Sequence, residues 1–361
     1  MRVLLVLDSA ADGGAERQTT RLAHELDSAG VEVRVHFLLA GGPRTTYLEE
    51  HGIPWTAFTK PVSAYGLGKV VSRLKQFILL VRTIGATQPD LIHGVMPITI
   101  VGVGLIRRLG IARPPAMASF RGELRSKSKL KTLLYRALIG TYGLVLANSK
   151  ALGDHIERKL SLAPGSVMVI PNGAELPPVR EPAIHKPEPP NVVMVANYRP
   201  HKGLDLLLDV ACRIQQDVCF RVVGHGMTHG GIPAAISQMG LQDRVVLLGG
   251  LSDISEELKR AKFAVHTSRS EGLCNAIIEE MSYGLPVLAW RIGGNEELIQ
   301  DGTNGFLFEL GDVDSMAQAI DTLLTSADMH SQMAAAARAS VQHLSWDRAV
   351  SQYSYIYQNL T

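Results

Sequence analysis

Residues 271–299 read EGLCNAIIEEMSYGLPVLAWRIGGNEELI, and this stretch is the most informative part of the chain. Its pattern predicts a loop, a helix that begins near Asn275 and then a buried strand. The free backbone N–H groups at the start of that helix can bind an anion. Glu271 lies before the loop, Glu279 lies about one turn inside the helix, and carboxylates accept hydrogen bonds from hydroxyls. A ligand that is part phosphate and part sugar, such as a nucleotide sugar, fits this combination.

A Gly-x-Pro strand start and a Gly-Gly-x-x-Glu turn follow the two carboxylates. They consist of Gly284, Leu285 and Pro286, and of Gly293, Gly294 and Glu297. In this order the motifs resemble the donor site of retaining glycosyltransferases, specifically glycosyltransferase family four, which has the GT-B fold. The resemblance is strongest over residues 145–310, and it implies that Glu271 orients the sugar. The other donor-binding residues implied by this stretch are Leu273, Cys274, Asn275, Glu279 and Glu297.

Length and composition limit the class of protein. A chain of 361 residues is long enough for two domains. Hydrophobic residues make up 46% and charged residues 19%, which is typical of globular proteins. The net charge of +2 gives no reason to expect a nucleic-acid partner. Three cysteines argue against a disulfide framework and for a reducing compartment, and we expect Cys274 to be a small loop residue rather than a nucleophile.

The N-terminal apolar run before Asp8 is too short for a signal peptide. No run of about 18 apolar residues is present to cross a bilayer. We therefore expect a cytoplasmic protein, at most peripheral at the inner membrane face.

Short apolar runs alternate with helical patterns in both halves of the chain, which indicates parallel sheets with right-handed crossovers. The expected strands are 2–8, 32–39, 53–58, 90–95, 115–120, 143–148 and 167–171, then 191–197, 218–224, 244–250, 263–267 and 286–291. The expected helices are 15–29, 66–85, 97–109, 128–141 and 149–160, then 203–215, 232–239, 253–261, 275–283, 312–324 and 327–343.

These elements predict an α/β protein of two doubly wound, Rossmann-like domains, which is the GT-B arrangement. The expected acceptor-side domain is 1–175 together with a C-terminal helix, 346–361, that packs back on it. A linker is expected at 176–190, because residues 171–191 hold seven prolines. Residues 191–345 then form the nucleotide-sugar-binding domain. The ligand is expected in the cleft at the carboxyl ends of both sheets.

Gly13 and Gly14 follow the first expected strand and precede a helix. Paired glycines allow positive φ and a close approach of the backbone to a ligand. The family has a similar Gly-Gly-Ala-Glu loop that faces the donor phosphates and the acceptor. A plain strand-to-helix turn is the alternative, and the Gly-x-Gly-x-x-Gly dinucleotide motif is absent.

Lys202 lies in the segment VANYRPHKG, residues 195–203, at the end of the first strand of the second half. It matches the family lysine that meets the leaving diphosphate. Asn197 occupies the position of the usual family arginine, so we expect Arg199 to substitute for it. Gly224 resembles the family's Gly-x-Gly turn near the nucleotide, although a tight turn alone also explains this glycine.

The first half departs further from the family, in which many members carry a histidine near the reacting sugar. The corresponding stretch, residues 118–123, reads ASFRGE. We expect Arg121 to position the diphosphate or the acceptor. His93, at the end of an expected strand, is the other candidate, although a histidine there is more often structural.

Retaining transfer in this fold needs no metal, because fixed cations and helix-start N–H groups stabilise the charge that develops on the leaving diphosphate. The resemblance therefore implies no metal site and no cofactor besides the donor, with a UDP-sugar favoured. Asp312-Val313-Asp314 mimics an Asp-x-Asp metal motif, and we expect it to cap a helix instead.

Residues 121–136, RGELRSKSKLKTLLYR, hold six basic residues and one glutamate. Together with residues 69–82 they indicate a basic amphipathic surface that would attract anionic phospholipids. An ordinary solvated helix face is the alternative.

The expected function is transfer of a hexosyl group, with retention, to a glycolipid, a polyisoprenoid-linked saccharide or a polysaccharide. Two alternatives stay open. A nucleotide-sugar 2-epimerase shares the fold, and a partner subunit that binds nucleotide sugars without catalysis would explain the missing histidine. Incubation with donor alone distinguishes the three by yielding an epimer, slow hydrolysis or neither.

Overall fold

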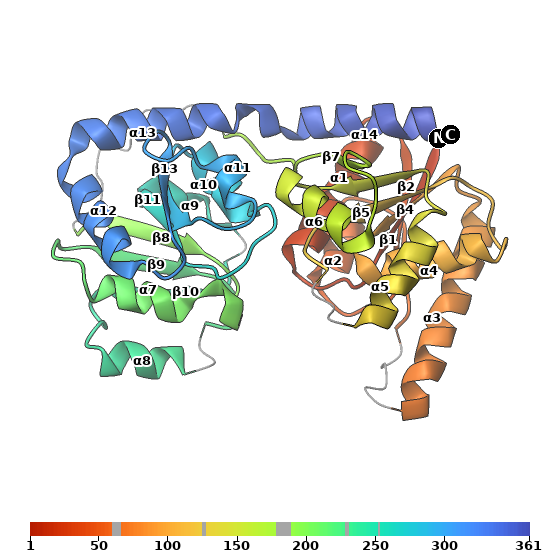
Figure 1. The fold of residues 1–361 in the computed structure, drawn as a ribbon, viewed down its shortest axis with the longest axis horizontal. Coiled ribbons are helices and arrows are strands. Elements are labelled where there is room, and N and C mark those ends of the chain that lie inside the picture. The colour runs from red at the N-terminus through yellow and green to blue at the C-terminus, as the bar shows by residue number, and fades with distance from the viewer. Residues whose placement is uncertain (60–65, 125–127, 178–188, 228–230, 252) are drawn as a thin grey trace. The chain divides into compact units, whose positions relative to one another are not determined.

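The computed structural model of the chain describes residues 1–59, 66–124, 128–177, 189–227, 231–251 and 253–361 (Figure 1). Two compact units are present: Met1–Gly173 with Trp346–Thr361, and Ala174–Ser345. The first segment of the first unit ends at Gly173, two residues before the expected end of the first domain at residue 175. Most of the expected linker, residues 178–188, lies outside the described residues.

The first unit contains a seven-stranded parallel sheet with the order β3-β2-β1-β4-β5-β6-β7. Its strands are β1 (Arg2–Leu7), β2 (Glu32–Phe37), β3 (Trp55–Ala57), β4 (Leu91–Val95), β5 (Ala116–Phe120), β6 (Leu144–Ala147) and β7 (Val167–Val169). Each of these strands lies within a range expected from the sequence.

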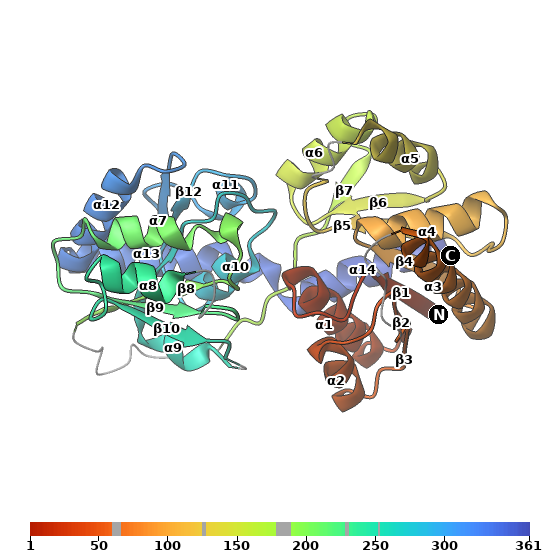
Figure 2. The same cartoon turned by 90° about the horizontal axis from the view of Figure 1, so that it is seen from below.

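Helices cover both faces of this sheet (Figure 2). Successive side chains of a strand point to opposite faces, so Leu4 and Val6 belong to one core cluster and Leu5 and Leu7 to the other. The Leu4 face packs against α3 (Gly66–Thr87), α4 (Pro97–Arg108), α5 (Lys129–Ile139) and α6 (Lys150–Leu160). The Leu5 face packs against α1 (Gly14–Ser28), α2 (Pro43–Glu50) and α14 (Trp346–Leu360).

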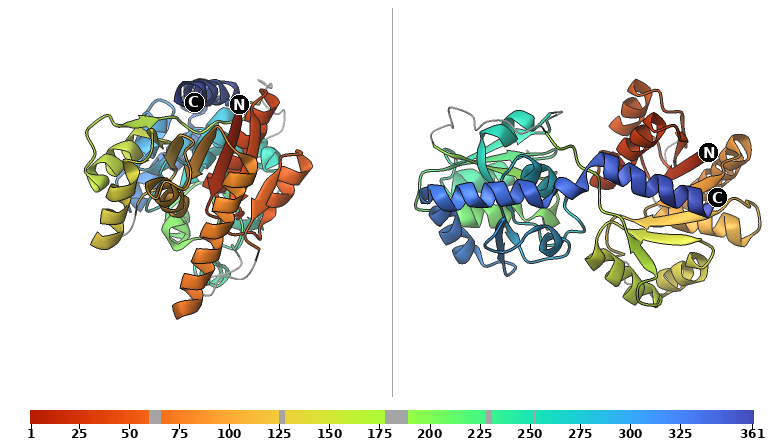
Figure 3. Two further views of the ribbon diagram at one scale, coloured as in Figure 1. Left: turned by 90° about the vertical axis from the view of Figure 1, so that its right-hand side faces the viewer. Right: turned by 90° about the horizontal axis from the view of Figure 1, so that it is seen from above.

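The C-terminal helix α14 is part of the first unit. Tyr353, Ile356 and Tyr357 are buried in the Leu5-face core, and α14 packs beside α1. Figure 3 shows both chain ends close together on this unit, where Thr361 Oγ1 lies 3.9 Å from Met1 Sδ. The expectation that the last helix packs on the first domain is confirmed.

The second unit contains a six-stranded parallel sheet with the order β10-β9-β8-β11-β12-β13. Its strands are β8 (Asn191–Val195), β9 (Cys219–Val223), β10 (Val245–Gly249), β11 (Ala261–His266), β12 (Val287–Trp290) and β13 (Gly305–Phe308). The sequence pattern missed β13 and placed the start of β11 two residues too late.

Two groups of helices cover the second sheet. The core on one face includes residues of α7 (Leu204–Ala211), α8 (Ile232–Gln238) and α12 (Val313–Thr325). The other face packs against α9 (Ser255–Arg260), α10 (Asn275–Ser282), α11 (Asn295–Leu298) and α13 (Ala327–Ser340). Short 3₁₀ helices η1 (Pro200–Lys202) and η2 (Gln342–Leu344) complete the unit.

In each sheet the strand order reverses direction at one point, between β1 and β4 and between β8 and β11. Loops that leave neighbouring strands at such a point diverge to opposite faces, and ligands of open α/β sheets bind there. In the second sheet these two loops carry Lys202 and Glu271. Among the described residues, the structure contains no helix with the length and apolarity needed to span a membrane.

Candidate active site

Lys202 and Glu271 form an ion pair at the strand-order reversal of the second sheet. Lys202 ends η1, which follows β8, and Glu271 lies in the loop after β11. Lys202 Nζ lies 2.6 Å from Glu271 Oε1, and both side chains are largely shielded from solvent. The sequence suggests a separate role for each residue, whereas the structure brings the two charges into one contact.

Backbone packing between the same two loops fixes the position of Lys202. Thr267 Oγ1 donates to the carbonyl oxygen of Gly203 over 2.8 Å, and the Arg269 N–H donates to the His201 carbonyl over 2.6 Å. Gly203 has φ +67°, and a Cβ there would lie 1.9 Å from the Thr267 carbonyl oxygen. Glycine is therefore required after Lys202 for this close approach.

The helix α10 begins at Asn275, as expected, and its N-cap residue Cys274 makes no side-chain cap. The Leu273 and Cys274 side chains are buried in the core, so only their backbone faces the loop. Burial raises the pKa of the Cys274 thiol to about 12, with the Glu271 charge adding to the effect. A thiolate nucleophile at neutral pH is thereby disfavoured.

Two adjacent glutamates of α10 point in different directions. Glu279 is exposed, whereas Glu280 is fully buried and hydrogen-bonds to His266. The sequence motif draws attention to Glu279, and the buried pair was not anticipated. The sequence gives no clear signal for this pair, because two adjacent residues lie only about 100° apart and can both face solvent on a half-buried helix.

The Gly293-Gly294 turn packs directly on the loop that follows Glu271. A Cβ on Gly293 would lie 2.2 Å from the Glu271 carbonyl oxygen, and one on Gly294 would lie 2.4 Å from that of Gly272. The Gly294 N–H also donates to the Gly272 carbonyl over 3.0 Å. These glycines therefore fix the loop backbone, and the exposed Glu297 follows in α11.

Asn197 helps to fix the turn after β9. Its Oδ1 accepts a 2.9 Å hydrogen bond from the His225 N–H, and the Tyr198 N–H donates to the His225 carbonyl over 2.8 Å. A Cβ on Gly224 would lie 1.9 Å from the Ala196 carbonyl oxygen, so contact between the two strand ends explains this glycine. Arg199 is exposed beside this turn and is available to a ligand.

In the first unit, neither of the paired glycines adopts the positive φ that glycine allows. Gly13 is the N-cap of α1 with φ −86°, and Gly14 opens the helix without positive φ. A Cβ on Gly13 would lie 2.3 Å from a carboxylate oxygen of Glu16, whose Oε1 accepts from Ser9 Oγ over 3.1 Å. The near atom is the end of a flexible side chain, which can move aside, so neither this contact nor the φ of Gly13 requires a glycine. Burial raises the pKa of the Glu16 carboxyl group.

Arg121 is held inside the first unit. Its guanidinium group donates to Asn172 Oδ1 and, over 3.1 Å, to the Tyr353 hydroxyl of α14. Its Nε is buried and has no hydrogen-bond partner among the described residues. The structure therefore gives Arg121 a role in attaching α14, and its expected role toward a ligand stays a prediction.

His93 is a core residue within β4 and does not lie at the end of the strand. Its Nδ1 hydrogen-bonds the Tyr357 hydroxyl over 2.8 Å, and its Nε2 hydrogen-bonds Ser119 Oγ over 2.6 Å. Complete burial, together with the charge of Arg121, lowers the pKa of His93 to about 3. The histidine is therefore neutral at physiological pH and has the structural role that the sequence favoured.

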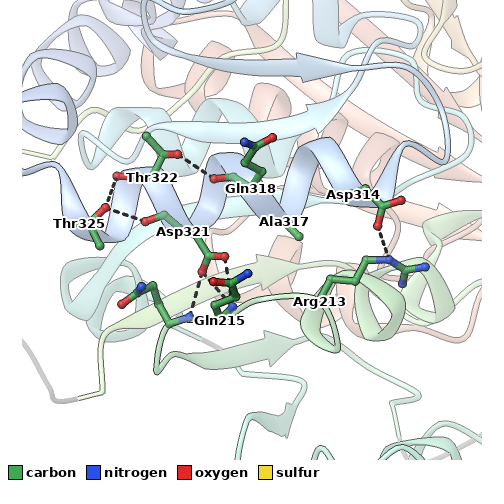
Figure 4. A pocket seen from close by; sticks show the side chains of 9 residues that line it. Arg213, Gln215, Asp314, Ala317, Gln318, Asp321, Thr322 and Thr325 are labelled. Carbon is green, nitrogen blue, oxygen red and sulfur yellow. Dashed lines mark hydrogen bonds and ion pairs between the residues drawn. The ribbon is translucent and has the colours of Figure 1, made fainter.

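A surface hollow of about 610 Å³ lies elsewhere in the second unit, between α12 and the segment after α7 (Figure 4). Asp321 accepts from the backbone N–H groups of Gln215 and Gln216, and Arg213 pairs with Asp314 over 2.6 Å. The charged groups that line the hollow are thus already paired or hydrogen-bonded within the protein, and none of the residues expected at the donor site lines it.

Asp312 caps α12, since its Oδ1 accepts from the Ser315 N–H over 3.2 Å. Asp314, the other carboxylate of the metal-like motif, pairs with Arg213. Within the described part of the chain, no three His, Cys, Asp or Glu side chains are grouped in a way that could hold a metal ion.

Two family descriptions together match almost the whole chain. Residues 12–176 match Glycosyltransferase Family 4, and residues 179–340 match Glycosyl transferases group 1. The two parallel sheets and these matches define a glycosyltransferase of the GT-B fold. The chain belongs to glycosyltransferase family four.

Solved structures support the fold. Anabaena HepE, determined in complex with UDP, aligns with a TM-score of 0.84 at 24% identity, covering 99% of this chain and 100% of that one. Sucrose-phosphate synthase from Thermosynechococcus elongatus aligns with a TM-score of 0.84 at 18% identity, covering 100% of this chain and 99% of that one.

Curated relatives match over different lengths. The UDP-Gal:alpha-D-GlcNAc-diphosphoundecaprenol alpha-1,3-galactosyltransferase of Escherichia coli is 27% identical over 305 residues, which is 77% of this chain and 76% of that one. The N-acetyl-alpha-D-glucosaminyl L-malate synthase of Bacillus anthracis is 28% identical over 172 residues, or 47% of this chain. That match spans about half the length of the Bacillus anthracis protein, 45%.

Proposed function

We propose that the protein is a retaining hexosyltransferase that uses a nucleoside diphosphate sugar, with UDP favoured as the nucleotide. The observation that carries this proposal is the 2.6 Å contact between Lys202 and Glu271 at the strand-order reversal, beside the start of α10. A cation, a carboxylate and the backbone N–H groups at the start of α10 match the diphosphate and sugar parts of one ligand. The UDP-Gal donor in the name of the E. coli relative and the UDP bound to HepE support the choice of nucleotide.

In the proposed reaction, the bond from the sugar C1 to the diphosphate breaks and a bond from C1 to an acceptor hydroxyl oxygen forms on the same face. The diphosphate leaves with the electrons of the broken bond, and one of its oxygens takes the proton that the acceptor hydroxyl loses. Lys202 and the N–H groups of α10 stabilise the negative charge that develops on the diphosphate, and Arg199 adds a second cation. Glu271 orients the sugar and Glu279 accepts hydrogen bonds from the ribose. These fixed charges support transfer without a metal.

A lipid-linked saccharide or a polysaccharide is the proposed acceptor, met at the inner face of a membrane. The E. coli relative and a Campylobacter jejuni relative, 25% identical over 50% of this chain, both carry diphospho-undecaprenol acceptors in their names. Both family descriptions name transferases, which weighs against the epimerase and the non-catalytic subunit.

Two helices of the first unit support contact with a membrane. The exposed side chains include Val70 (63%) and Leu74 (57%) of α3 and Leu130 (77%) and Leu133 (62%) of α5. On each helix the two side chains lie about one turn apart, and exposed apolar side chains of this kind are typical of lipid or protein contact. Both helices pack on the Leu4 face of the first sheet, on either side of α4.

Exposed basic residues surround these apolar side chains. On α3 they are Lys69, Arg73 and Lys75, and on α5 they are Lys129, Lys131 and Arg136. Arg125 and Lys127, also part of the expected basic run, lie outside the described residues. Basic and apolar side chains on one helix surface are suited to an anionic lipid interface.

A screen of nucleotide sugars tests the proposed donor. The purified protein is incubated with each UDP-, GDP- and ADP-sugar, first without an acceptor, and its thermal stability and the products are measured. We expect a UDP-sugar to raise the melting temperature and to be hydrolysed slowly with release of UDP. Formation of a 2-epimer without UDP release, or binding of no nucleotide sugar, would contradict the proposal.

A further inference from the structure

His266 and Glu280 form a buried pair directly behind the proposed donor site. His266 Nε2 lies 2.7 Å from Glu280 Oε2, and the two side chains are 1% and 0% exposed. Buried polar groups of this kind contribute to one specific arrangement when they are paired, and they are costly when one partner is lost. In the proposed reaction neither residue contacts a substrate, so the pair needs another explanation.

The histidine lies at the end of the strand that leads into the donor site. His266 is the last residue of β11, in register with Ala289 of β12. The next residue, Thr267, is fully buried and holds Gly203, the neighbour of Lys202. The same segment continues to Glu271. The position of His266 therefore affects both members of the Lys202–Glu271 pair.

The glutamate lies on the helix that carries the other donor carboxylate. Glu279 and Glu280 are neighbours on α10, and successive residues of an α-helix point about 100° apart. Holding Glu280 toward the core consequently directs Glu279 outward. The 2.7 Å bond to His266 is thus a direct connection between α10 and the end of β11.

We propose that His266 and Glu280 are positioning residues of the donor site. Their hydrogen bond fixes the rotation and depth of α10 against the end of β11, and this sets Glu279 at the correct distance from Lys202 and Glu271. The inference rests on the proposed function, since Glu279 and the Lys202–Glu271 pair are taken to bind two parts of one nucleotide sugar. Errors of about 1 Å in such positions lower rates by about 100-fold.

The test compares Glu280→Ala with a core substitution of the same unit that does not connect the two parts of the site. Leu323→Ala is a suitable control, because Leu323 is fully buried in α12 and its truncation also lowers stability. UDP affinity is measured by calorimetry, and kcat and KM are measured with the UDP-sugar that the wild type uses best. Both measurements are made at temperatures where all variants are folded. We expect Glu280→Ala to weaken UDP binding and kcat/KM by about 10- to 100-fold, and Leu323→Ala to match the wild type.

Conservative and double substitutions separate positioning from packing. Glu280→Gln keeps the shape and one hydrogen bond to His266, so we expect it to restore most of the lost affinity. His266→Ala combined with Glu280→Ala is expected to lose little more than either change alone, because both remove one interaction. If Glu280→Ala does not fold, Glu280→Leu fills the space without the hydrogen bond, and the same loss is expected.

The outcomes distinguish this inference from the proposed function. If the wild type binds UDP and Glu280→Ala or Glu280→Leu binds it equally well, the positioning role is wrong while the donor assignment stands. If the wild type binds no UDP and turns over no UDP-sugar, the donor assignment fails and the positioning role fails with it.

Discussion

Lys202 and Glu271 are far apart in the sequence, yet the lysine ammonium lies 2.6 Å from the glutamate carboxylate. Each group neutralises the other before a donor binds. In the proposed reaction, an arriving diphosphate draws Lys202 at least partly away from Glu271, and the Glu271 carboxylate then faces the sugar. We therefore expect donor binding to separate this pair. Lys202 would then contact the departing phosphate, and Glu271 would accept hydrogen bonds from the sugar hydroxyls.

Replacing Lys202 by alanine is expected to slow transfer by about 100- to 1000-fold, the scale for loss of one electrostatic stabiliser of a transition state. The measurement is kcat with saturating donor. Lys259→Ala is a matched control, because Lys259 also pairs with a glutamate over 2.6 Å, Glu256, but lies on α9. A Lys202→Ala enzyme as fast as the control would remove Lys202 from the mechanism.

Replacing the two proposed donor carboxylates, Glu279 and Glu271, is expected to affect different quantities. Glu279→Ala should weaken UDP binding by about tenfold or more, since a charged hydrogen bond is worth about 1.5–3 kcal/mol. Glu271→Ala should lower kcat more than UDP affinity, because UDP lacks the hexosyl group that Glu271 is proposed to orient. Calorimetry with UDP and steady-state kinetics separate the two, with Glu309→Ala at an exposed site as control. Unchanged UDP affinity in Glu279→Ala would exclude ribose binding by this residue.

Turnover is expected to continue after treatment with EDTA. In the proposed reaction, Lys202, Arg199 and the N–H groups of α10 supply the positive charge for the diphosphate in place of a metal ion. The measurement is the initial rate before and after chelation, and after addition of magnesium or manganese. Loss of activity with EDTA and recovery with either ion would show that the metal-free mechanism is wrong.

Membrane binding is expected to have an electrostatic and an apolar part. Attraction of the basic residues is screened over about 8 Å at physiological salt, so binding to anionic vesicles should fall as salt rises. Replacing Lys129, Lys131 and Arg136 by glutamate should abolish binding. Leu130→Ser with Leu133→Ser should weaken it even at low salt.

The control replaces Lys259 and Arg260 of the second unit by glutamate, and vesicle flotation is the measurement. If the wild type does not float with anionic vesicles at low salt, α3 and α5 are ordinary solvated surfaces. A soluble acceptor then becomes the better proposal.

His93 is expected to affect the pH dependence of stability without taking part in the chemistry. Its pKa is about 3 in the folded protein and about 6.5 when unfolded, so the unfolded chain binds more protons between these values. The stability due to His93 is therefore complete above about pH 6.5 and is lost by about 1.4 kcal/mol per pH unit as the pH falls toward 3.

The test uses His93→Gln. Its free energy of unfolding should differ more from the wild type at about pH 7.5 than at about pH 5. Its turnover at neutral pH should be close to that of the wild type where both are folded. A large loss of turnover without loss of stability would show that His93 takes part in catalysis.

The sequence predicted the two sheets well because their strands are buried on both faces. Such strands form short continuous apolar runs that turn signals separate. The pattern missed β13, a four-residue strand that begins with Gly305, and α2, which has only Leu48 buried. Short elements with little apolar periodicity depend on their neighbours for stability, and a local pattern does not reveal them.

The candidate site was predictable in its motifs but not in its contacts. Glu271, Lys202 and the glycines were found from their order along the chain, whereas the Lys202–Glu271 pair depends on how β8 and β11 are placed in the sheet. His93 and Arg121 were weighed as candidates near a ligand. Their partners Tyr357 and Tyr353 come from α14, hundreds of residues later, and no local pattern connects them.

The return of α14 to the first unit has a consequence for biosynthesis. The second unit is one uninterrupted segment, Ala174–Ser345, whereas the first needs Trp346–Thr361 to cover the apolar face around Leu5. On the ribosome the later unit is therefore able to finish folding before the earlier one. Until Tyr353 and Tyr357 emerge, the nascent first unit exposes a core surface and leaves His93 without its tyrosine partner. Such an intermediate is prone to aggregation, and chaperones are expected to act on it during synthesis.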